Sequence, residues 1–359
     1  MGKRDTWSVA NMRKIINIAI NPCGIGGTET FSRVLNQHFN NSETYSYNRL
    51  KKPLFEAHFV LIKIPIHLKI VRKLFFNKIP NRYLYSYPFS NDNIIIINAP
   101  CDFDQIPFRV LRNNKVIYFA HSVPSHILTH GNYFGANRER RLKALQYVDR
   151  IVCLSQEYVE PLAKFLQYPI SQFRVVTHTI EIEKVNKPKE LQRTVITICR
   201  LDIGLKRLDR FVEVAKHLPD YHFVIYGEGQ DEALIRRMAN GISNISFKGA
   251  TNDIAGAHQK AGIFLLTSEY EGFGITIIES LSQATPVLIC ENSFAMARNI
   301  VNDGINGFVC EKYSVADVIN KIRLIEQDYR SYSERAYKSF ERFNAQSFIQ
   351  LWKTIFAEL

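Results

Sequence analysis

The feature that most constrains the fold is the segment 261–290, in which a Gly-rich turn joins a buried strand to a helix. Residues 261–266 (AGIFLL) form a short apolar run that is typical of a buried parallel strand. Residues 268–274 (SEYEGFG) are expected to form a loop, residues 275–282 a helix, and residues 287–290 a second strand. A strand, turn, helix and strand in this order make up the repeating unit of a parallel sheet.

The Gly-rich turn is suited to an anionic ligand. It leaves backbone N–H groups without partners at the positive end of a helix dipole, where a phosphate binds well. Glu271 and Glu279 lie on either side of the predicted start of the helix. Carboxylates accept hydrogen bonds and repel phosphates, so we expect hydroxyl groups as their partners. A diphosphate with hydroxyl-rich groups on both sides is a nucleotide sugar, which is our first hypothesis for the ligand.

Short apolar strands and helices alternate along most of the chain, which predicts α/β domains with doubly wound parallel sheets. Further strands are expected at 14–21, 93–98, 115–120, 150–154, 174–176, 194–199, 222–226 and 244–248. Further helices are expected at 137–148, 156–167, 208–217, 231–239 and 253–260. A chain of 359 residues suits two such domains, and the polar segment 181–193 is typical of a linker between them.

Other candidate site residues follow predicted strands, at the edge where ligands of doubly wound sheets bind. His121 follows one such strand, and Arg200 and Lys206 follow another. The two cations could neutralise a diphosphate as it departs. Gly26 and Gly27 end a Gly-rich turn after the first strand. A lone histidine is more often structural than catalytic, so only its position makes His121 a candidate.

The net charge of +12 is concentrated in residues 49–82, where nine lysines and arginines are accompanied by one acid, Glu56. Bulky apolar residues lie between these cations, a composition typical of a segment at the surface of an anionic membrane. The alternative is that the apolar residues pack on a neighbouring sheet while the lysines are solvated. Both interpretations remain open, whereas the apolar density argues against a nucleic-acid partner.

The sequence argues against several other classes of protein. It has no apolar run of about 18 residues, which a membrane-spanning helix requires, and residues 1–13 lack the apolar core of a secretory signal. The six cysteines lie singly, as expected of buried thiols in a reducing compartment. Asp102 and Asp104 form a DxD pattern, which can hold a metal, but no further ligand is apparent, so we expect an ordinary loop and no metal.

The spacing of Glu271 and Glu279, with GFGITII between them, resembles the E-x7-E signature of the retaining glycosyltransferases of family 4 (glycosyl transferases group 1), which have the GT-B fold. Pro286-Val287 follows, as in that family. The resemblance covers nearly the whole chain. It is strong over residues 194–308 and loose over residues 40–91.

Other positions match this family as well. Arg200 and Lys206 match its basic pair, Gly26 and Gly27 match its Gly-Gly loop, and His121 matches a histidine that ends a strand of the acceptor domain. The tail FERFNAQSFIQLW is similar to a terminal helix that crosses back onto the first domain.

Three positions depart from the family pattern. Cys199 and Ala284 replace glycines that are usual in the family, and residues 177–179 (THT) lack a common Asn-Gly. None of these is a charged or catalytic position, so the resemblance implies altered packing rather than lost activity.

The resemblance implies a GT-B fold of two Rossmann-like, doubly wound domains that face a central cleft. Residues 1–187 would bind the acceptor, and the C-terminal helix within 340–359 would complete this domain. Residues 188–339 would bind the nucleotide sugar.

The resemblance also implies roles for the matched residues. Arg200 and Lys206 would bind the donor diphosphate, Glu271 and Glu279 would bind hydroxyls of the sugar and the ribose, and His121 would orient the transferred sugar. No metal or cofactor is expected, because the leaving phosphate oxygen would itself take the proton of the acceptor on the front face. The remaining donor-binding positions would be Gly26, Gly27, Gly272, Phe273, Gly274, Ile275 and Thr276.

These features predict a retaining hexosyltransferase that moves a sugar from a nucleotide sugar to a glycan, expected to be lipid-linked, in lipopolysaccharide, capsule or other surface polysaccharide biosynthesis. We expect it in the cytoplasm, at the inner face of the cell membrane. The alternatives are a transferase that acts on a small soluble acceptor, an epimerase of the same fold, and a nucleotide-sugar-binding scaffold subunit without turnover. Epimerases lack the E-x7-E arrangement, and the intact charged residues argue against a scaffold.

Overall fold

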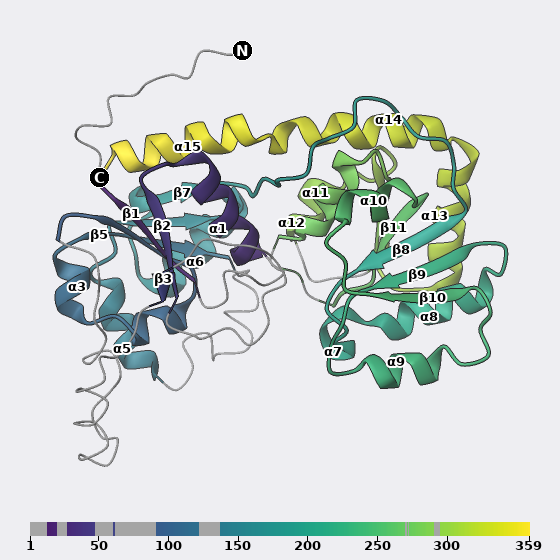
Figure 1. The fold of residues 1–359 in the computed structure, drawn as a ribbon, viewed down its shortest axis with the longest axis horizontal. Coiled ribbons are helices and arrows are strands. Elements are labelled where there is room, and N and C mark those ends of the chain that lie inside the picture. Colours follow the sequence, from purple (N-terminus) through teal and green to yellow (C-terminus); the bar gives the residue numbers. More distant parts are fainter. Residues whose placement is uncertain are drawn as a thin grey trace. The chain divides into compact units, whose positions relative to one another are not determined.

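The computed structural model describes residues 13–19, 27–46, 60–61, 91–121, 137–269, 271, 273–290 and 295–359. The chain divides into two compact units (Figure 1). Unit 1 comprises Met1–Thr177 and Ile349–Leu359, and unit 2 comprises His178–Phe348. The domain boundary expected at residue 187 therefore lies inside unit 2. Of the basic and apolar segment 49–82, only residues 60–61 are among those that the structure describes.

Unit 1 contains a parallel sheet whose strand order is β3-β2-β1-β4-β5-β6-β7. The order reverses between β1 and β4, as the prediction of a doubly wound sheet requires. The strands β1, β4 and β5 are apolar and buried because helices cover both faces of a parallel sheet. The strands are β1 (Ile15–Ile18), β2 (Ser42–Ser46), β3 (Val60–Leu61), β4 (Ile94–Ile97), β5 (Lys115–Ala120), β6 (Arg150–Cys153) and β7 (Phe173–Val175).

Successive aromatic residues of β5 contact helices on opposite faces of this sheet, because side chains alternate along a strand. The Phe119 ring lies 4.9 Å from that of Phe31 in α1, and the Tyr118 ring lies 5.6 Å from that of Phe103 in η3. The described helices that contribute to unit 1 are α1 (Gly27–His38), η3 (Pro100–Asp104), α3 (Phe108–Arg112), α5 (Arg138–Leu145), η5 (Gln156–Tyr158), α6 (Val159–Leu166), η6 (Ile170–Gln172) and α15 (Ala345–Ala357).

The end of α15 belongs to unit 1, although it is the last helix of the chain. Trp352 is fully buried, with its ring 5.2 Å from Phe31 and 5.5 Å from Phe119. Glu358 forms ion pairs with Arg150 at 3.0 Å and with Arg174 at 2.7 Å. The prediction that the C-terminal helix returns to the first domain is therefore confirmed.

Unit 2 contains a second parallel sheet, with the strand order β10-β9-β8-β11-β12-β13. Its order reverses between β8 and β11, so this sheet is also doubly wound, as predicted. The strands are β8 (Thr194–Ile198), β9 (His222–Tyr226), β10 (Ile245–Gly249), β11 (Ile263–Leu266), β12 (Val287–Ile289) and β13 (Gly307–Val309).

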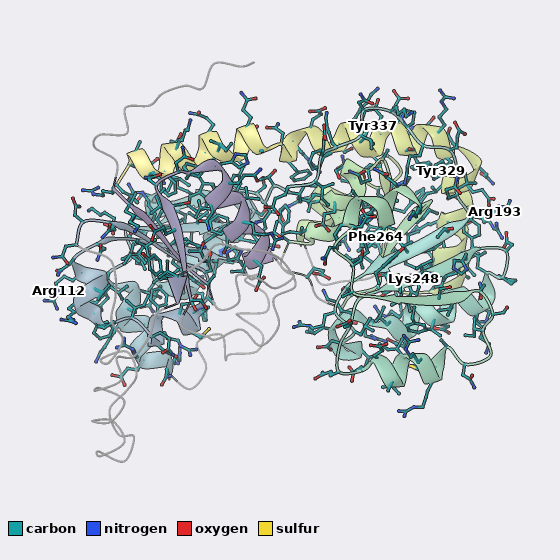
Figure 2. All side chains as sticks on the ribbon, in the orientation of Figure 1. Arg112, Arg193, Lys248, Phe264, Tyr329 and Tyr337 are labelled. Atoms are coloured by element: carbon teal, nitrogen blue, oxygen red, sulfur yellow. The ribbon has the colours of Figure 1, made fainter. Side chains whose placement is uncertain are left out.

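Helices cover both faces of this second sheet (Figure 1). Phe264 of β11 is buried inside unit 2, with its ring 5.3 Å from His258 of α10, whereas Arg193 lies at the edge of the unit (Figure 2). The next residue, Leu265, belongs to a buried cluster with Phe211 of α8 and Ile325 of α13. The described helices of unit 2 are α7 (Ile203–Lys206), α8 (Leu208–His217), α9 (Glu232–Met238), α10 (Ile254–Gln259), α11 (Ile275–Ser282), α12 (Ala295–Ile300), α13 (Val315–Gln327), α14 (Tyr329–Ser339) and η7 (Phe340–Phe343).

The polar segment 181–193, which was expected to be a linker, is instead attached to unit 2. Lys189 Nζ donates hydrogen bonds to the carbonyls of His258 and Ala261, at 2.7 and 2.8 Å, and to Thr285 Oγ1 at 2.6 Å. These carbonyls lie at the carboxyl end of α10, where a helix dipole favours a cation. The polar composition therefore predicted the irregular structure of this segment correctly, but the segment is not a free linker between domains.

Among the described residues, no helix combines the length and the hydropathy that a bilayer-spanning segment requires.

Replacing Trp352 tests the attachment of α15 to unit 1. Trp352→Ala is expected to lower the free energy of unfolding by about 3–5 kcal/mol, because it leaves a cavity beside Phe31 and Phe119. Leu351, on the same helix, is 44% exposed, and Leu351→Ala should change stability by less than about 0.5 kcal/mol. Urea unfolding followed by circular dichroism measures both effects, and equal losses would contradict the packing of α15.

Two buried histidines predict that unit 2 loses stability in weak acid. Burial lowers the pKa of His178 and of His258 to about 3. An unfolded histidine titrates near pH ~6.5, so below that pH the unfolded state binds protons that the folded state does not bind. The free energy of unfolding should therefore fall by about 1.4 kcal/mol per pH unit for each histidine as the pH drops from about 6 to 5.

Urea unfolding between pH 7 and pH 5 measures this slope. His258→Phe should reduce this slope by about 1.4 kcal/mol per pH unit between pH 6 and 5, because one of the two buried imidazoles is removed. His217→Gln, at an exposed position of α8, is the matched control. An unchanged slope in His258→Phe would show that folding does not lower the pKa of His258.

Candidate functional site

The candidate site residues of unit 2 follow β8 and β11, the two strands between which the strand order reverses. Ligands of open parallel sheets bind outside the carboxyl ends of the strands at such a point. Arg200 and Lys206 follow β8, whereas Glu271 lies between β11 and α11. The sheet topology therefore brings together residues that are far apart in the sequence.

Lys206 and Glu271 form an ion pair between Nζ and Oε1. The two side chains are only 15% and 13% exposed, so solvent screens the pair less than it screens a surface pair. Ser268 Oγ donates a second hydrogen bond to the same carboxylate oxygen, at 2.7 Å. The sequence analysis predicted both charged residues as site residues, but predicted neither their pairing nor the role of Ser268.

Cys199 and Arg200 directly follow β8, on the same segment of the chain as Lys206. Arg200 is exposed and forms no ion pair with a described residue. Burial raises the pKa of the Cys199 thiol to about 12, while the charge of Lys206 opposes that shift and the charge of Glu271 adds to it. Cys199, which takes the place of a glycine in the family pattern, is therefore within the electrostatic reach of the ion pair.

The turn before α11 has the conformation that its glycine allows. Gly274 has φ +78°, in the left-handed region, and a Cβ at this position would lie 2.7 Å from Ile277 Cδ1. Phe273 is buried, with its ring 5.1 Å from that of His178. The helix begins at Ile275, as predicted, so the first N–H groups of α11 have no acceptor within the helix.

The other predicted residues of this turn lie on α11 or outside the described part. Ile275, Thr276 and Glu279 are half-buried, and their spacing places them on one face of the helix. Glu279 lies in the second turn of α11, and its backbone carbonyl accepts a hydrogen bond from Ser282 Oγ at 2.7 Å. Gly272 is outside the described residues.

His121 lies in unit 1, directly after β5, and its ring centroid is 4.0 Å from that of Phe119. Its Nε2 is 2.9 Å from Oδ1 of Asn98, the residue after β4. The amide nitrogen of Asn98 donates to Asn17 Oδ1 and to the Ile18 carbonyl, both at 2.7 Å. Because Oδ1 of Asn98 can only accept, Nε2 of His121 carries the proton in this contact. Asn98 thus fixes the tautomer and the orientation of His121.

Sequence analysis did not identify Asn98 as a site residue. The available signal was an asparagine at the end of a run of isoleucines, since a buried polar residue needs a partner. Gly27 begins α1, whose Phe31 ring is 5.8 Å from His121. Gly26 lies outside the described residues.

The DxD pattern forms the 3-10 helix η3 instead of the expected loop. Asp104 forms an ion pair with Arg141 and accepts a hydrogen bond from Asn137 at 2.9 Å, and Asp102 accepts one from the Ala99 N–H at 2.9 Å. Both carboxylates therefore hold η3 in place. Within the described ranges, no three His, Cys, Asp or Glu side chains are grouped to hold a metal, and the expectation of a metal-free reaction stays a prediction.

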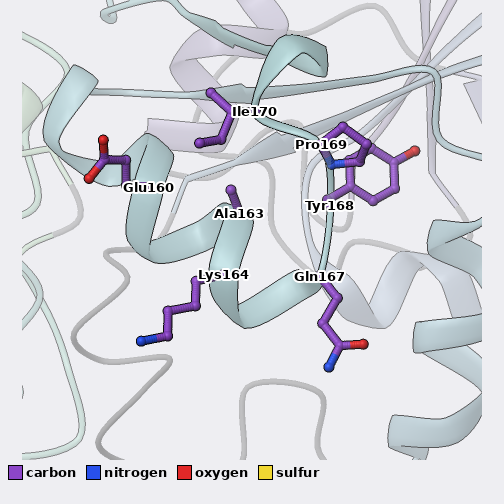
Figure 3. A pocket seen from close by; sticks show the side chains of 7 residues that line it. All are labelled: Glu160, Ala163, Lys164, Gln167, Tyr168, Pro169 and Ile170. Atoms are coloured by element: carbon purple, nitrogen blue, oxygen red, sulfur yellow. The ribbon is translucent and has the colours of Figure 1, made fainter.

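A hollow of about 450 Å³ lies elsewhere on unit 1, at the end of α6 (Figure 3). None of the predicted site residues lines it. Its lining consists of Glu160, Ala163, Lys164, Gln167, Tyr168, Pro169 and Ile170.

Known proteins resemble this chain in sequence. Residues 179–342 match the family of glycosyl transferases group 1. The chain is 25% identical over 329 residues to the poly(glycerol-phosphate) alpha-glucosyltransferase of Bacillus subtilis (strain 168), which covers 86% of this chain and 47% of that protein. It is 23% identical over 283 residues to the poly(ribitol-phosphate) alpha-N-acetylglucosaminyltransferase of Staphylococcus aureus (strain COL), which covers 74% and 56%. The chain thus spans about half the length of these curated relatives.

A solved structure resembles nearly the whole chain. Anabaena HepE in complex with UDP and glucose superposes with a TM-score of 0.73 and 14% identity, over 97% of this chain and 100% of that one. This likeness and the two doubly wound units show that the chain has the GT-B fold, as predicted. The segment that carries Lys206, Glu271 and Glu279 is the part that matches the glycosyl transferases of group 1.

Proposed function

We propose that the chain is a retaining glycosyltransferase of family 4 that transfers a sugar from a nucleotide sugar to a glycan without a metal. The observation that carries this proposal is the partly buried pair of Lys206 and Glu271, beside the start of α11 at the reversal point of the second sheet. This pair lies within the segment that matches the glycosyl transferases of group 1.

The donor diphosphate would bind between the cations and the first turn of α11. Arg200 is free of described carboxylates, and Lys206 could exchange Glu271 for a phosphate oxygen. Both positive charges would then stabilise the negative charge that develops as the nucleotide leaves. The N–H groups at the start of α11 would contribute further hydrogen bonds, helped by the helix dipole.

The carboxylates and His121 would position the two sugars. Glu271, once it is released from Lys206, would accept hydrogen bonds from hydroxyls of the transferred sugar, and Glu279 would accept them from the ribose. His121 would orient the transferred sugar, held by its contact with Asn98. The bond from the anomeric carbon to the leaving phosphate oxygen breaks, the acceptor oxygen bonds to the same face, and the phosphate oxygen takes the acceptor proton.

The distribution of charge supports an anionic acceptor or an anionic surface on the side of unit 1. Unit 1 contains 25 Lys and Arg against 12 Asp and Glu, whereas unit 2 contains 21 against 22. Unit 1 therefore has a net charge of +13 and unit 2 one of −1. Two relatives are named for polyol-phosphate acceptors. We propose a lipid-linked or phosphate-bearing glycan, used in surface polysaccharide synthesis at the cytoplasmic face of the membrane.

Nucleotide binding and turnover test the proposal. Wild-type protein is expected to be stabilised against heat by one nucleoside diphosphate or one nucleotide sugar, in a panel of uridine, guanosine, adenosine and thymidine compounds, with or without EDTA. Release of the nucleoside diphosphate from the matching donor measures turnover. Lys206→Ala should lower turnover on the order of 10²-fold. Lys216→Ala, at an exposed position of α8, should leave it unchanged.

Each other outcome favours a different function. Binding without turnover would support a scaffold subunit, and loss of binding in EDTA would require a metal. Near-wild-type turnover by Lys206→Ala would remove Lys206 from the mechanism. Stabilisation by no compound of the panel at millimolar concentration would contradict the donor site itself.

A further inference from the structure

Two loops that carry the predicted donor residues are joined by hydrogen bonds to the backbone carbonyls of one of them. The β8 loop consists of residues 199–207, and the β11 loop of residues 267–269 and 271. Thr267 Oγ1 donates a hydrogen bond to the Lys206 carbonyl, and the Glu269 N–H donates one to the Leu205 carbonyl, each at 2.8 Å. The backbone on either side of Lys206 Cα is therefore tied to the loop that contains Glu271.

A second connection between the loops is electrostatic and lies next to Lys206. Arg207 Nη1 donates to Glu269 Oε2 at 2.9 Å, and Arg210 Nη2 is 3.2 Å from the same oxygen. Arg207 also holds Asp209, through Nε at 3.1 Å and Nη2 at 2.9 Å. Arg210 is buried, and its guanidinium lies 4.8 Å from the Tyr313 ring. Glu269 thus connects the β11 loop to Arg210, whose buried side chain belongs to α8.

The backbone of Arg207 is in a conformation that side chains disfavour. Its φ of +47° and ψ of +47° lie in the left-handed region, where a Cβ is crowded by the following carbonyl. Arg207 is the single residue between α7, which ends at Lys206, and α8, so this conformation sets the change of chain direction directly after Lys206. Such a conformation persists at a functional site only where the surroundings hold it.

The cations of the β8 loop differ in whether carboxylates of the protein already occupy them. Two carboxylates already pair with Arg207, so its guanidinium is occupied within the protein. Arg200 has no such partner among the described residues, and Lys206 has only the one carboxylate that a phosphate could replace. Arg207 is therefore placed to position a neighbouring cation rather than to bind the ligand.

We propose that Arg207 and Glu269 form a charged clamp that positions Lys206 for the donor diphosphate. The clamp keeps the β8 and β11 loops at one separation, so that Lys206 Nζ can move from Glu271 to a phosphate oxygen without movement of the backbone. Arg207 and Glu269 are positioning residues, because they act through Lys206. This inference rests on the proposed function, since it assigns to the clamp a role in donor binding.

The test uses variants that distinguish the effect of the guanidinium charge of Arg207 from the effect of its backbone conformation. Arg207→Gly keeps the left-handed conformation without crowding and removes the charge, and Glu269→Gln removes the opposite charge. The double variant closes a mutant cycle. Arg236→Gln breaks an exposed ion pair with Glu232 on α9 and is the matched control. The probes are UDP, GDP, ADP and dTDP in calorimetric titrations, together with amide hydrogen exchange of residues 199–207 and 267–271.

The clamp predicts weaker nucleotide binding and looser loops. Arg207→Gly and Glu269→Gln should each raise the Kd of the bound nucleoside diphosphate by about five- to tenfold, and the double variant should add little more. The Glu269 amide should exchange faster in all three variants, and Arg236→Gln should match the wild type.

The possible failures are distinguishable. If the wild type binds a nucleoside diphosphate and Arg207→Gly binds it equally well, the clamp is overturned while the proposed function stands. Additive losses in the double variant would likewise overturn it, because the two residues would then act separately. If the wild type binds no nucleoside diphosphate, both the clamp and the proposed function are overturned.

Discussion

The reversal of strand order in each parallel sheet is the constraint on which the rest of the structure depends. Helices must cover both faces of such a sheet, so its central strands are buried and apolar, and polar side chains gather where the strands end. In unit 2 these ends carry Lys206 and Glu271, and in unit 1 they carry Asn98 and His121. The same topology that buries the isoleucine-rich strands therefore assembles both groups of candidate site residues.

Charge compensation explains how the Lys206 ammonium can be largely buried at the candidate site. An unpaired ammonium that is only 15% exposed would be costly, and Glu271 offsets that cost. In the proposed function, a phosphate oxygen could not replace Glu271 if Glu271 bound Lys206 too tightly. The hydrogen bond from Ser268 to Glu271 also holds this carboxylate in position. In the proposed function, this ion pair is the state from which a nucleotide sugar would release both side chains.

Two of the three departures from the family pattern can be described in local physical terms. Ala284 has φ +55°, a backbone conformation that glycine adopts readily, and its carbonyl accepts a hydrogen bond from the buried Ser333 hydroxyl at 2.8 Å. Cys199 is a small side chain within the electrostatic reach of the ion pair, and it replaces no charge. Ala284 thus has a backbone conformation that favours glycine, and the expectation of altered packing at these positions stays a prediction.

Local patterns in the sequence predicted the strands and helices that carry most of the candidate residues, because periodicity and turn chemistry are local. They did not predict β2, β3 and β13 or the helices α3, α12, α13 and α14. The helix predicted at 275–282 is α11, and His121, Arg200 and Lys206 follow strands as expected. Which of these residues contact one another depends on the tertiary structure. Lys206 and Glu271 are 65 residues apart, and they pair because β8 lies beside β11 in the sheet, which no local pattern encodes. The contact between His121 and Asn98 likewise depends on neighbouring strands of the sheet in unit 1. The polar segment that contains Lys189 becomes part of unit 2 because carbonyls at the end of α10 accept hydrogen bonds from Lys189.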